Sequence, residues 1–446
     1  MTPHSIGRLA SDPEGLRHVF AKTALLALLC GFTGGTALAQ APADPATGGS
    51  SKTTPAAETA GFFAEPRAIG RGVELARRVR FLANGGEGGE VKNGLYPELS
   101  NMVTGAGWIS GGPGYRQWLF GDRLFLDGSA AISWRAYQTA QARAELTNLA
   151  RSRIAVGSQA MWQDLTQVTY FGEGQESVES DRSEYHLQAL NVVGYAIFRP
   201  RRSLSVNGRL GWISQPTVSS PTGTFKRGNP STQEVFPEDP VFAQSQQPSY
   251  HYYELSAALD TRDQRNRATR GGLYRAGWVG YSAHDDGPFS FGRSEVEAAH
   301  FVPLAGSRVV LAAHGWLVAT TLRDDQTVPF YFLPSLGGNN TLRSYNDYRF
   351  HDRNLLLASV EARVALFTHV DGAGFVDAGN VAHRLGELNL DRTSIGVGLR
   401  VHRSGTTFAR FDVAHGNEGW GFVFRMHDSL QLARVARRTA AVPFVP

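Results

Sequence analysis

Hydrophobic and polar residues alternate with a period of two over most of the chain from about residue 101 onward. In "SLSVNGRLGW" the apolar side chains share one face and the polar side chains share the other, the apolar set being Leu204, Val206, Leu210 and Trp212. The same alternation recurs in "RLFLDGSAAISWRAY" (123–137), "SRIAVGSQAMWQ" (152–163), "TSIGVGLRV" (393–401) and "WGFVFRM" (420–426). Because a period of two is that of a β-strand with two different faces, the sequence predicts an all-β fold.

The length and number of these segments favour a membrane barrel over a soluble sandwich, which would show the same alternation. Many segments run for about nine to fourteen residues, which is longer than most soluble strands and sufficient to cross a bilayer. Aromatic residues gather near segment ends, and the polar faces carry the Arg, Asp, Gln and Gly expected of a wet lumen. About sixteen such segments lie between Asn101 and Met426. The prediction is a single transmembrane antiparallel β-barrel over residues 95–428, with residues 429–446 as a C-terminal extension.

Residues 1–39 have the features of a secretory signal peptide. Basic residues precede the apolar run "TALLALLCGFTGGTALA", which ends in a small-x-small pattern before Gln40. A membrane-anchoring helix is the alternative, but the strongly apolar part, residues 24–32, is too short to span a bilayer comfortably. The one cysteine, Cys30, lies inside this segment, so cleavage would leave no thiol for a disulfide or for catalysis. We therefore expect export to the outer membrane of a Gram-negative bacterium.

A linker and one helix are predicted between the signal peptide and the barrel. Residues 40–63 are rich in Pro, Ala, Thr and Gly, a composition typical of a disordered linker. In residues 64–86, Pro66 can open a helix, and Asn84 and Gly85 can close it. The apolar stripe of this helix fits either an amphipathic helix in the periplasm or a helix that enters the barrel lumen as a plug.

Composition and motifs argue against several function classes. Basic residues exceed acidic residues by 4, and the sequence pI is about 9.2, but no basic run or nucleic-acid motif accompanies this charge. The sequence contains no Gly-x-Ser-x-Gly elbow, phosphate-binding loop or His-Glu-x-x-His metal site. The short stretches "FHDRN" and "HGNEGW" place His351 and His415 in loops or at a rim. We therefore predict no enzyme activity, no catalytic residue, no metal, no cofactor and no nucleic-acid partner.

Two long polar connections interrupt the alternation, at residues 215–249 and 323–353. In our count of strands the second connection joins the eleventh strand to the twelfth. It holds most of "GGNNTLRSYNDYRFHDRN", residues 337–354, which is too long for a hairpin turn and carries three arginines among aromatic residues. Such a loop needs a reason beyond reversing the direction of the chain.

Five motifs carry a resemblance to a known family. The stretches "LGGNNTLRSY" (336–345), "LLLASVEARVAL" (355–366), "GFVDAGNV" (374–381) and "SIGVGLRV" (394–401) follow one another in order, and "DTRDQRNRATRGG" (260–272) precedes them. In this the chain resembles the bacterial surface antigen barrels, the outer-membrane superfamily that includes the BamA insertase, TamA and the two-partner secretion transporters. The motifs cover about residues 260–426, whereas residues 101–253 match by alternation alone.

The resemblance implies a latch inside the barrel. In the family, the long loop folds back into the lumen, and acidic residues on the next two strands hold its Arg; by position these residues are Arg343, Glu361 and Asp377. The alternation around Glu361 independently assigns it to the lumen face. The alternative is that both acids are ordinary lumen-lining charges. Ser344 departs from the pattern, because the family usually has Gly there.

Two further groups of residues belong to the matching motifs. The loop motif consists of Gly337, Gly338, Leu342, Ser344 and Tyr345, and the strand-turn motif consists of Asp260, Arg262, Asp263, Arg270 and Gly271.

The resemblance also implies a function, with one departure. Members that insert or secrete proteins carry periplasmic POTRA modules before the barrel, but only about 60 residues separate Gln40 from the first predicted strand, without a βααββ pattern. We therefore expect a member without POTRA domains that takes part in outer-membrane protein assembly or translocation. The alternative is a passive channel or structural barrel. The expected partners are outer-membrane lipid and client outer-membrane proteins, and the sequence carries no indication of the oligomeric state.

Overall fold

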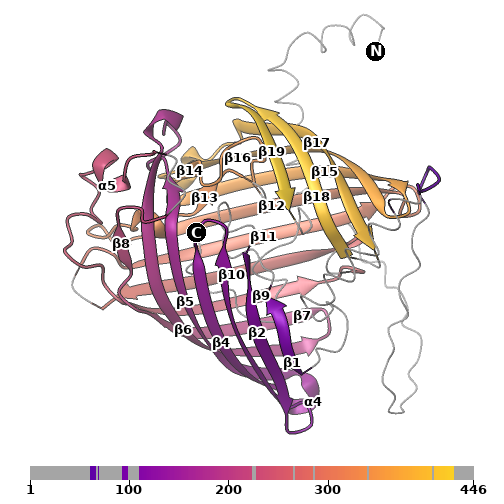
Figure 1. Ribbon diagram of the computed structural model, residues 1–446, viewed down its shortest axis with the longest axis horizontal. Helices are drawn as coiled ribbons and strands as arrows, with labels where there is room; N and C mark the ends of the chain where they lie inside the picture. The colour runs from indigo at the N-terminus through magenta and orange to yellow at the C-terminus, as the bar shows by residue number, and fades with distance from the viewer. Residues whose placement is uncertain are drawn as a thin grey trace, which may run out of the picture.

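Sixteen antiparallel strands follow one another in chain order around one curved sheet (Figure 1). They are β1 (Gly94–Glu98), β2 (Ser110–Leu119), β3 (Leu124–Ser133), β4 (Gln138–Asn148), β5 (Ile154–Tyr170), β6 (Ser183–Arg201), β7 (Leu204–Ile213), β9 (Tyr250–Asp260), β10 (Gly271–Ala283), β11 (Phe291–Pro303), β12 (Val309–Thr321), β15 (Asn354–Phe367), β16 (Val370–Ala382), β17 (Arg392–Arg403), β18 (Thr406–Gly416) and β19 (Gly419–Arg425). Each of these strands pairs with the next. A seventeenth strand of the sheet, β8 (Thr217–Ser219), pairs with β6. The all-β barrel predicted from the alternation is confirmed, as is the number of its strands.

The computed structural model describes residues 61–66, 69, 93–98, 110–223, 228–264, 267–284, 287–338, 341–403 and 406–425. The expected signal peptide, most of the expected linker and the C-terminal extension lie outside the described residues. Of the helix expected at residues 64–86, the structure describes only residues 64–66, which are not helical, and Ile69.

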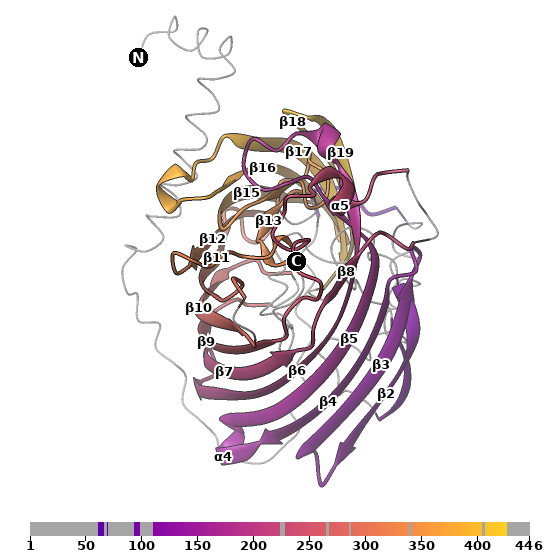
Figure 2. The ribbon, with the colours of Figure 1, turned by 90° about the vertical axis from the view of Figure 1, so that its left-hand side faces the viewer.

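Successive connections fall alternately at the two ends of the barrel, as the alternating strand directions require. One end holds the long connections, including residues 214–249 between β7 and β9 and residues 322–353 between β12 and β15. As predicted, the second of these joins the eleventh strand to the twelfth. We call this the loop end and the opposite side the turn end. Figure 2 shows the barrel with much of its loop end toward the viewer.

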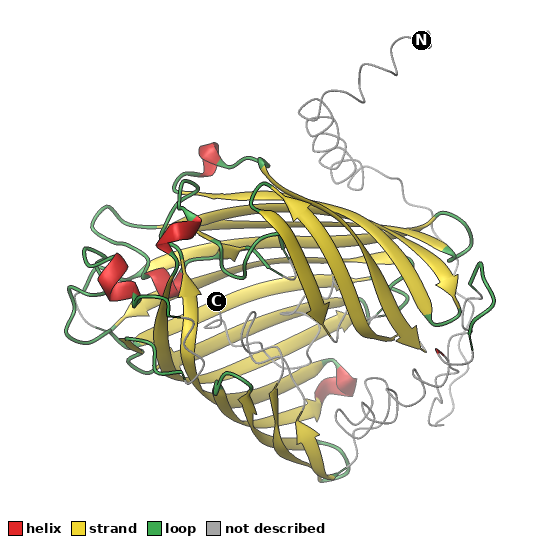
Figure 3. Ribbon diagram, turned by 45° about the horizontal axis from the view of Figure 1, so that its top comes forward, coloured by secondary structure: helices red, strands yellow, loops and turns green. Residues whose placement is uncertain are grey.

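In the described residues from 93 onward, helical structure is confined to short turns in the connections (Figure 3). These are α4 (Leu149–Ser152), α5 (Thr232–Val235), η2 (Glu179–Asp181), η3 (Phe330–Phe332) and η4 (Leu385–Glu387). In the part of the chain that the structure describes, none of these helices has the length or the apolar character needed to cross a membrane.

The two faces of the wall differ as a lipid-facing barrel requires. Along β6, residues from Val192 to Phe198 alternate between exposed even-numbered positions and buried odd-numbered positions. Large apolar side chains on many strands are exposed, among them Ile132, Trp134, Leu210, Trp212, Leu255, Trp278, Ile395, Val397, Trp420 and Phe422. So much exposed apolar surface is unfavourable in water and is typical of the outer face of a membrane barrel.

Aromatic side chains fill part of the lumen toward the loop end. The turn η3 contributes Phe330, Tyr331 and Phe332, all of them buried, to a cluster that contains strand residues such as Tyr250 and Tyr281. Phe332 packs against Tyr281 with ring centroids 5.0 Å apart. The connection between β12 and β15 is therefore anchored in the barrel by apolar packing before it reaches its arginines.

β1 and β19 are the first and last strands that the structure describes. β1 pairs with β2, and β19 pairs with β18. Within the residues that the structure describes, no ladder joins β1 to β19, and Figure 1 shows the two strands apart. We call this boundary the seam.

The described segment before the barrel lies against the turn end. The backbone N–H groups of Phe62 and Phe63 donate hydrogen bonds to the carbonyl oxygens of Ala365 and Leu366, at 2.9 and 2.8 Å. The carboxylate of Glu65 accepts a hydrogen bond from the His369 backbone N–H at 2.8 Å. The turn between β15 and β16 therefore fixes the position at which the preceding chain reaches the barrel.

Candidate functional site

The lumen loop, residues 337–354, is closed at its base by a small hairpin. Strands β13 (Ser335–Leu336) and β14 (Phe350–His351) pair over two residue pairs. Gly337 and Gly338 follow β13 with φ of 118° and 82°, values that favour glycine over any other residue. The Gly338 N–H lies 3.1 Å from the carbonyl oxygens of both Leu342 and Tyr345. The two glycines therefore serve to turn the chain into the loop.

Apolar side chains hold the tip of the lumen loop against the wall. Leu342, Tyr345 and Phe350 are buried in one cluster with residues of β12, β15 and β16, including Leu355 and Val381. The residues of the predicted loop motif thus shape and anchor the loop. Arg343, which lies between Leu342 and Ser344, makes its charged contacts.

Arg343 reaches both carboxylates that the family resemblance assigned to it. Its Nη1 donates to Glu361 Oε2 at 2.7 Å, and its Nε and Nη2 donate to the two carboxylate oxygens of Asp377 at 2.8 and 2.7 Å. The guanidinium also lies 3.3 Å from the centroid of the Phe375 ring. Arg343 is 3% exposed, Asp377 1% and Glu361 0%. The Arg therefore makes a fork with one carboxylate and a single bond with the other, in a site with almost no access to water.

The network is larger than the sequence indicated. Arg400 on β17 donates to Glu361 at 2.9 Å and also binds Asp412 on β18. Arg363 donates to Glu361 at 2.8 Å, and Asp412 Oδ2 lies 3.7 Å from Arg343 Nη1. The signal for Arg400 was its position on the polar face of "SIGVGLRV", which predicts the lumen side but not its partner. Four successive strands, β15 to β18, thus supply charged groups to one buried cluster.

Ser344 fits because the strands, and not the loop, provide the space. Its Oγ lies 2.6 Å from Ser394 Oγ on β17, and its N–H donates to that same oxygen at 3.1 Å. On β19, a Cβ added to Gly421 would lie 2.5 Å from the Arg343 carbonyl oxygen and 2.7 Å from Ser344 Cα. On β18, a Cβ added to Gly416 would collide with the Ser344 Oγ, so the departure from the family pattern is accommodated by the glycine of that strand.

The far part of the lumen loop reaches the hairpin of the last two strands. Arg349 forms a salt bridge with Glu418 at 2.8 Å, in the turn between β18 and β19. Arg425 at the end of β19 has its Nη2 3.7 Å from Asp347 Oδ2. Together with Gly421, these contacts connect the loop to β19, which is one edge of the seam.

Comparison with known proteins identifies the family. A family model described as the Omp85 superfamily domain matches residues 115–424, more than half of the chain. The chain belongs to the Omp85 superfamily. This confirms the resemblance that the sequence motifs indicated, and it makes the protein an outer-membrane barrel of a family that consists generally of transport and assembly proteins.

The fold is similar to that of a solved BamA structure. BamA from Haemophilus ducreyi lacking POTRA domains 1–3 is 15% identical, with a TM-score of 0.57 over 75% of this chain and 70% of that chain. CdiB from Escherichia coli is 14% identical (TM-score 0.48, 80% and 69% covered), and CdiB from Acinetobacter baumannii is 14% identical (TM-score 0.44, 74% and 58% covered). No curated protein sequence matches the chain. At these identities the similarity to BamA is one of fold.

The strand-turn motif of this Omp85 barrel forms the turn between β9 and β10 at the turn end. Asp263 accepts hydrogen bonds from the Thr269 N–H at 2.9 Å and from the Arg270 N–H at 3.3 Å, and Arg262 folds onto Asp260 at 2.9 and 3.0 Å. Gly271 has φ 81°, and a Cβ there would collide with the backbone of the turn. These residues shape a turn, and the structure does not bring them together with Arg343.

The two histidines that the sequence placed in loops or at a rim occupy different environments. His351 in β14 is buried, with its ring centroid 5.1 Å from that of Tyr170. Burial, with the nearby Arg349 charge as the smaller cause, lowers the pKa of His351 to about 3. His415 is exposed near the end of β18 and packs against Trp420. His351 is therefore neutral at physiological pH and serves as packing.

A hydrogen-bonded row of the Ser–His–Asp type lies on adjacent strands near the loop end. His186 Nε2 lies 2.8 Å from Asp164 Oδ1, and its Nδ1 lies 3.4 Å from Ser219 Oγ. Ser219 stands directly opposite His186 in the pairing of β6 with β8. Side chains in directly opposite positions of an antiparallel pair are normally in contact. We interpret the row as polar cross-strand pairing.

Proposed function

We propose that this Omp85 barrel acts in outer-membrane protein assembly or translocation, by opening its wall at the seam between β1 and β19 under the control of the lumen loop. The proposal includes export through the predicted signal peptide to the outer membrane of a Gram-negative bacterium, with outer-membrane proteins as clients. The observation that carries it is the lumen loop, which is bonded to the strand on one side of the seam.

The seam supplies the physical means. A transmembrane sheet normally pairs every strand, because an unpaired N–H or C=O in lipid costs several kcal/mol. Within the described part of the chain, no ladder joins β1 to β19. Such edges can pair with an added strand, which is the mode of recognition that an assembly or translocation barrel needs.

The lumen loop supplies the control. Arg343 is bonded to β15 and β16, Ser344 is bonded to β17, and Arg349 forms a salt bridge with the turn that begins β19. A simple channel needs no buried guanidinium with its own carboxylates in the lumen, and such a site is costly unless all of its charges are paired. The latch role of Arg343, Glu361 and Asp377 belongs to this proposal.

A passive channel is the competing function. Its support is the polar lumen, which carries buried charged side chains on many strands, for example Arg275 with Glu295. Against it stands the aromatic cluster around η3, which fills the lumen toward the loop end with buried apolar side chains. Water and solutes need a continuous polar path, so this packing favours the seam over the lumen as the route.

Two measurements test the proposal. The first is the outer-membrane and secreted proteome of a strain that lacks the gene, complemented with the wild-type chain or with Arg343→Ala. Loss of specific proteins that only the wild-type chain restores is the expected result. An unchanged proteome with altered solute uptake would favour the channel.

The second measurement tethers the seam. Cysteines placed at Leu95 on β1 and Phe422 on β19 are joined by a cleavable bifunctional maleimide in cells that depend on the protein. The matched control joins Ala130→Cys to Ala140→Cys, which are direct partners of β3 and β4. We expect the seam tether alone to block rescue and its cleavage to restore rescue. Full rescue with the seam tethered would contradict an opening wall.

A further inference from the structure

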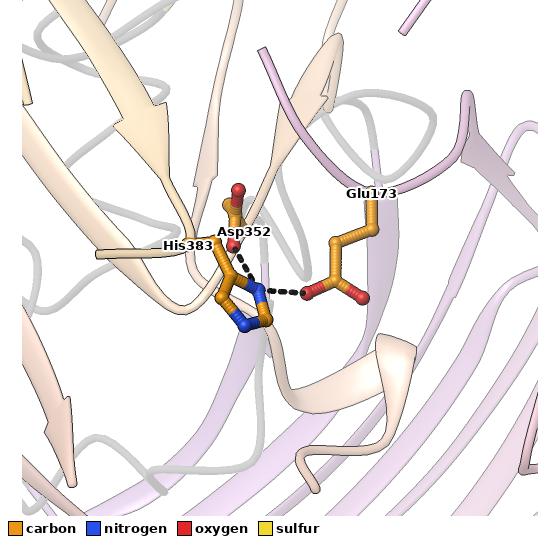
Figure 4. Close-up of side chains that lie close together, drawn as sticks. All are labelled: Glu173, Asp352 and His383. Atoms are coloured by element: carbon orange, nitrogen blue, oxygen red, sulfur yellow. Dashed lines mark ion pairs between the residues drawn. The ribbon is translucent and has the colours of Figure 1, made fainter. Parts of the chain in front are cut away.

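Three side chains from distant parts of the sequence meet at the loop end of the barrel. Glu173 follows β5, Asp352 lies between β14 and β15, and His383 follows β16. Figure 4 shows the His383 ring facing both carboxylates with the same nitrogen. No motif spacing connects these residues in the sequence, so only the fold brings them together.

The distances suit a shared ligand. His383 Nδ1 lies 3.8 Å from Glu173 Oε1 and 3.9 Å from Asp352 Oδ1, and one ligand atom from each residue lies within 4.8 Å of the others. Around a tetrahedral metal with bonds of about 2.1 Å, neighbouring ligand atoms stand about 3.4 Å apart. The two His383 distances exceed that spacing by a few tenths of an ångström. The two carboxylate oxygens lie within 4.8 Å of each other, and rotation of the Glu173 and Asp352 side chains would bring all three ligand atoms to that spacing.

The backbone of each of the three residues is fixed. Glu173 forms an isolated bridge with His351, and the next N–H, that of Gly174, donates to the His351 carbonyl oxygen at 2.7 Å. The Asn354 side-chain amide donates to the His383 carbonyl oxygen at 3.0 Å. Asp352 immediately follows His351 and is itself 3% exposed. The ligands are therefore preorganised by main-chain contacts, which lowers the entropic cost of binding an ion.

The net charge of the three-residue cluster and its neighbour also favours the binding of a cation. Two carboxylates share the cluster, and the guanidinium of Arg353 approaches one of them, with its Nε 3.9 Å from Glu173 Oε1. With both carboxyl groups ionised, as in a metal-bound state, and with His383 neutral, the two carboxylates and this one guanidinium sum to a net charge of −1, which a divalent ion would turn positive. The His383 side chain is 53% exposed, so an ion can reach the cluster from solvent and keep water in its remaining positions.

We propose that Glu173, Asp352 and His383 bind one divalent cation of the zinc class. One imidazole nitrogen and two carboxylate oxygens form a borderline ligand set that suits Zn²⁺ better than Ca²⁺ or Mg²⁺, which prefer oxygen alone. The ion ties the β5–β6 connection, the end of the lumen loop and the β16–β17 connection to one another. Binding would thus hold the loop end closed around the base of the lumen loop, independently of whether the barrel assembles proteins.

The experiment is isothermal titration of the full-length chain, refolded in detergent free of lipopolysaccharide, with Zn²⁺, Ca²⁺ and Mg²⁺ in turn. We expect one saturable Zn²⁺ site whose affinity falls at least tenfold in His383→Ala and in Asp352→Asn. His415→Ala, which removes an exposed histidine outside the cluster, should bind as tightly as the wild-type chain. Because His383 is exposed, its alanine variant should fold normally, which heat-modifiable gel mobility checks.

Two further readouts keep the proposal falsifiable. Co²⁺ should give the intense visible absorption of a four-coordinate N/O site in the wild-type chain and lose it in Glu173→Gln. Zn²⁺ should also slow proteolytic cleavage of residues 171–182 and 383–391 in the wild-type chain and not in His383→Ala. Equal Zn²⁺ affinity in His383→Ala and the wild-type chain, no saturable Zn²⁺ binding, or tighter binding of Ca²⁺ than of Zn²⁺ would each overturn the assignment.

Discussion

Arg343→Ala removes the one guanidinium that the lumen loop places between two buried carboxylates. The two carboxylates differ in the arginines that remain bonded to them in this variant. Glu361 retains Arg363 at 2.8 Å and Arg400 at 2.9 Å. Among the described residues, the hydrogen bonds of the Asp377 side chain all come from Arg343. The variant therefore leaves Asp377 buried, charged and without its cation.

The expected cost follows from that burial. A buried ion pair that loses one partner costs about 3–5 kcal/mol, whereas a solvent-screened pair is worth about 1 kcal/mol or less. Asp377 is 1% exposed, so the buried case applies. Neutralising the orphaned acid in the double variant Arg343→Ala with Asp377→Asn should recover a large part of the loss, because the amide can stay buried at lower cost.

The assay is urea unfolding of the refolded barrel in detergent, followed by tryptophan fluorescence and by heat-modifiable gel mobility. Arg209→Ala is the matched control. Arg209 on β7 binds Glu254 at 3.0 Å, but Glu254 keeps Arg275 at 2.9 Å, so no carboxylate loses its last cation and we expect a smaller loss than in Arg343→Ala. The reasoning is refuted if Arg343→Ala loses no more stability than Arg209→Ala, or if Asp377→Asn restores nothing.

Three further perturbations have defined outcomes. Gly421→Ala should push the tip of the lumen loop away and cost about 1–3 kcal/mol in the same unfolding assay, whereas Gly208→Ala, whose Cβ would meet no atom within 4 Å, should cost far less; equal losses would contradict the packing argument. Glu65→Ala should free the segment before the barrel, seen as faster proteolysis there with a stability change below about 1 kcal/mol, and unchanged cleavage would show that the contact is not holding it. Deleting residues 64–84 should raise single-channel conductance if the predicted helix plugs the lumen, and an unchanged conductance would assign it to the periplasm.

The fold was predictable because each strand of a membrane barrel alternates apolar residues that face the lipid with polar residues that face the lumen. Alternation alone gave the fold class, the strand number and the position of the long loop between the eleventh and twelfth strands. It also gave the lumen side of Glu361 and Arg400. It could not give their partners, because which residues come level across neighbouring strands depends on the stagger of the sheet, and alternation carries no information on stagger.

The site was predictable only where a motif pointed to it. The resemblance assigned Arg343 to Glu361 and Asp377, and the structure places the three in direct contact. The space for the Ser344 side chain was not predictable, since it comes from Gly416, which lies far along the chain on another strand. Glu173, Asp352 and His383 were missed for the same reason, because no local pattern joins residues that meet only in the folded barrel.

The bonds of the lumen loop make the two edges of the seam mechanically unequal. From inside the barrel, the loop is tied to β15, β16 and β17 and reaches β19 through Glu418 and Arg425. β1 is held by five residue pairs with β2 and by the hydroxyl of Tyr96, which donates to Asp127 on β3 at 2.8 Å. If the seam opens as proposed, β19 is the edge that keeps its position and β1 is the edge that moves. A client strand that paired at the seam would therefore meet β19 in a fixed position and would have to displace β1.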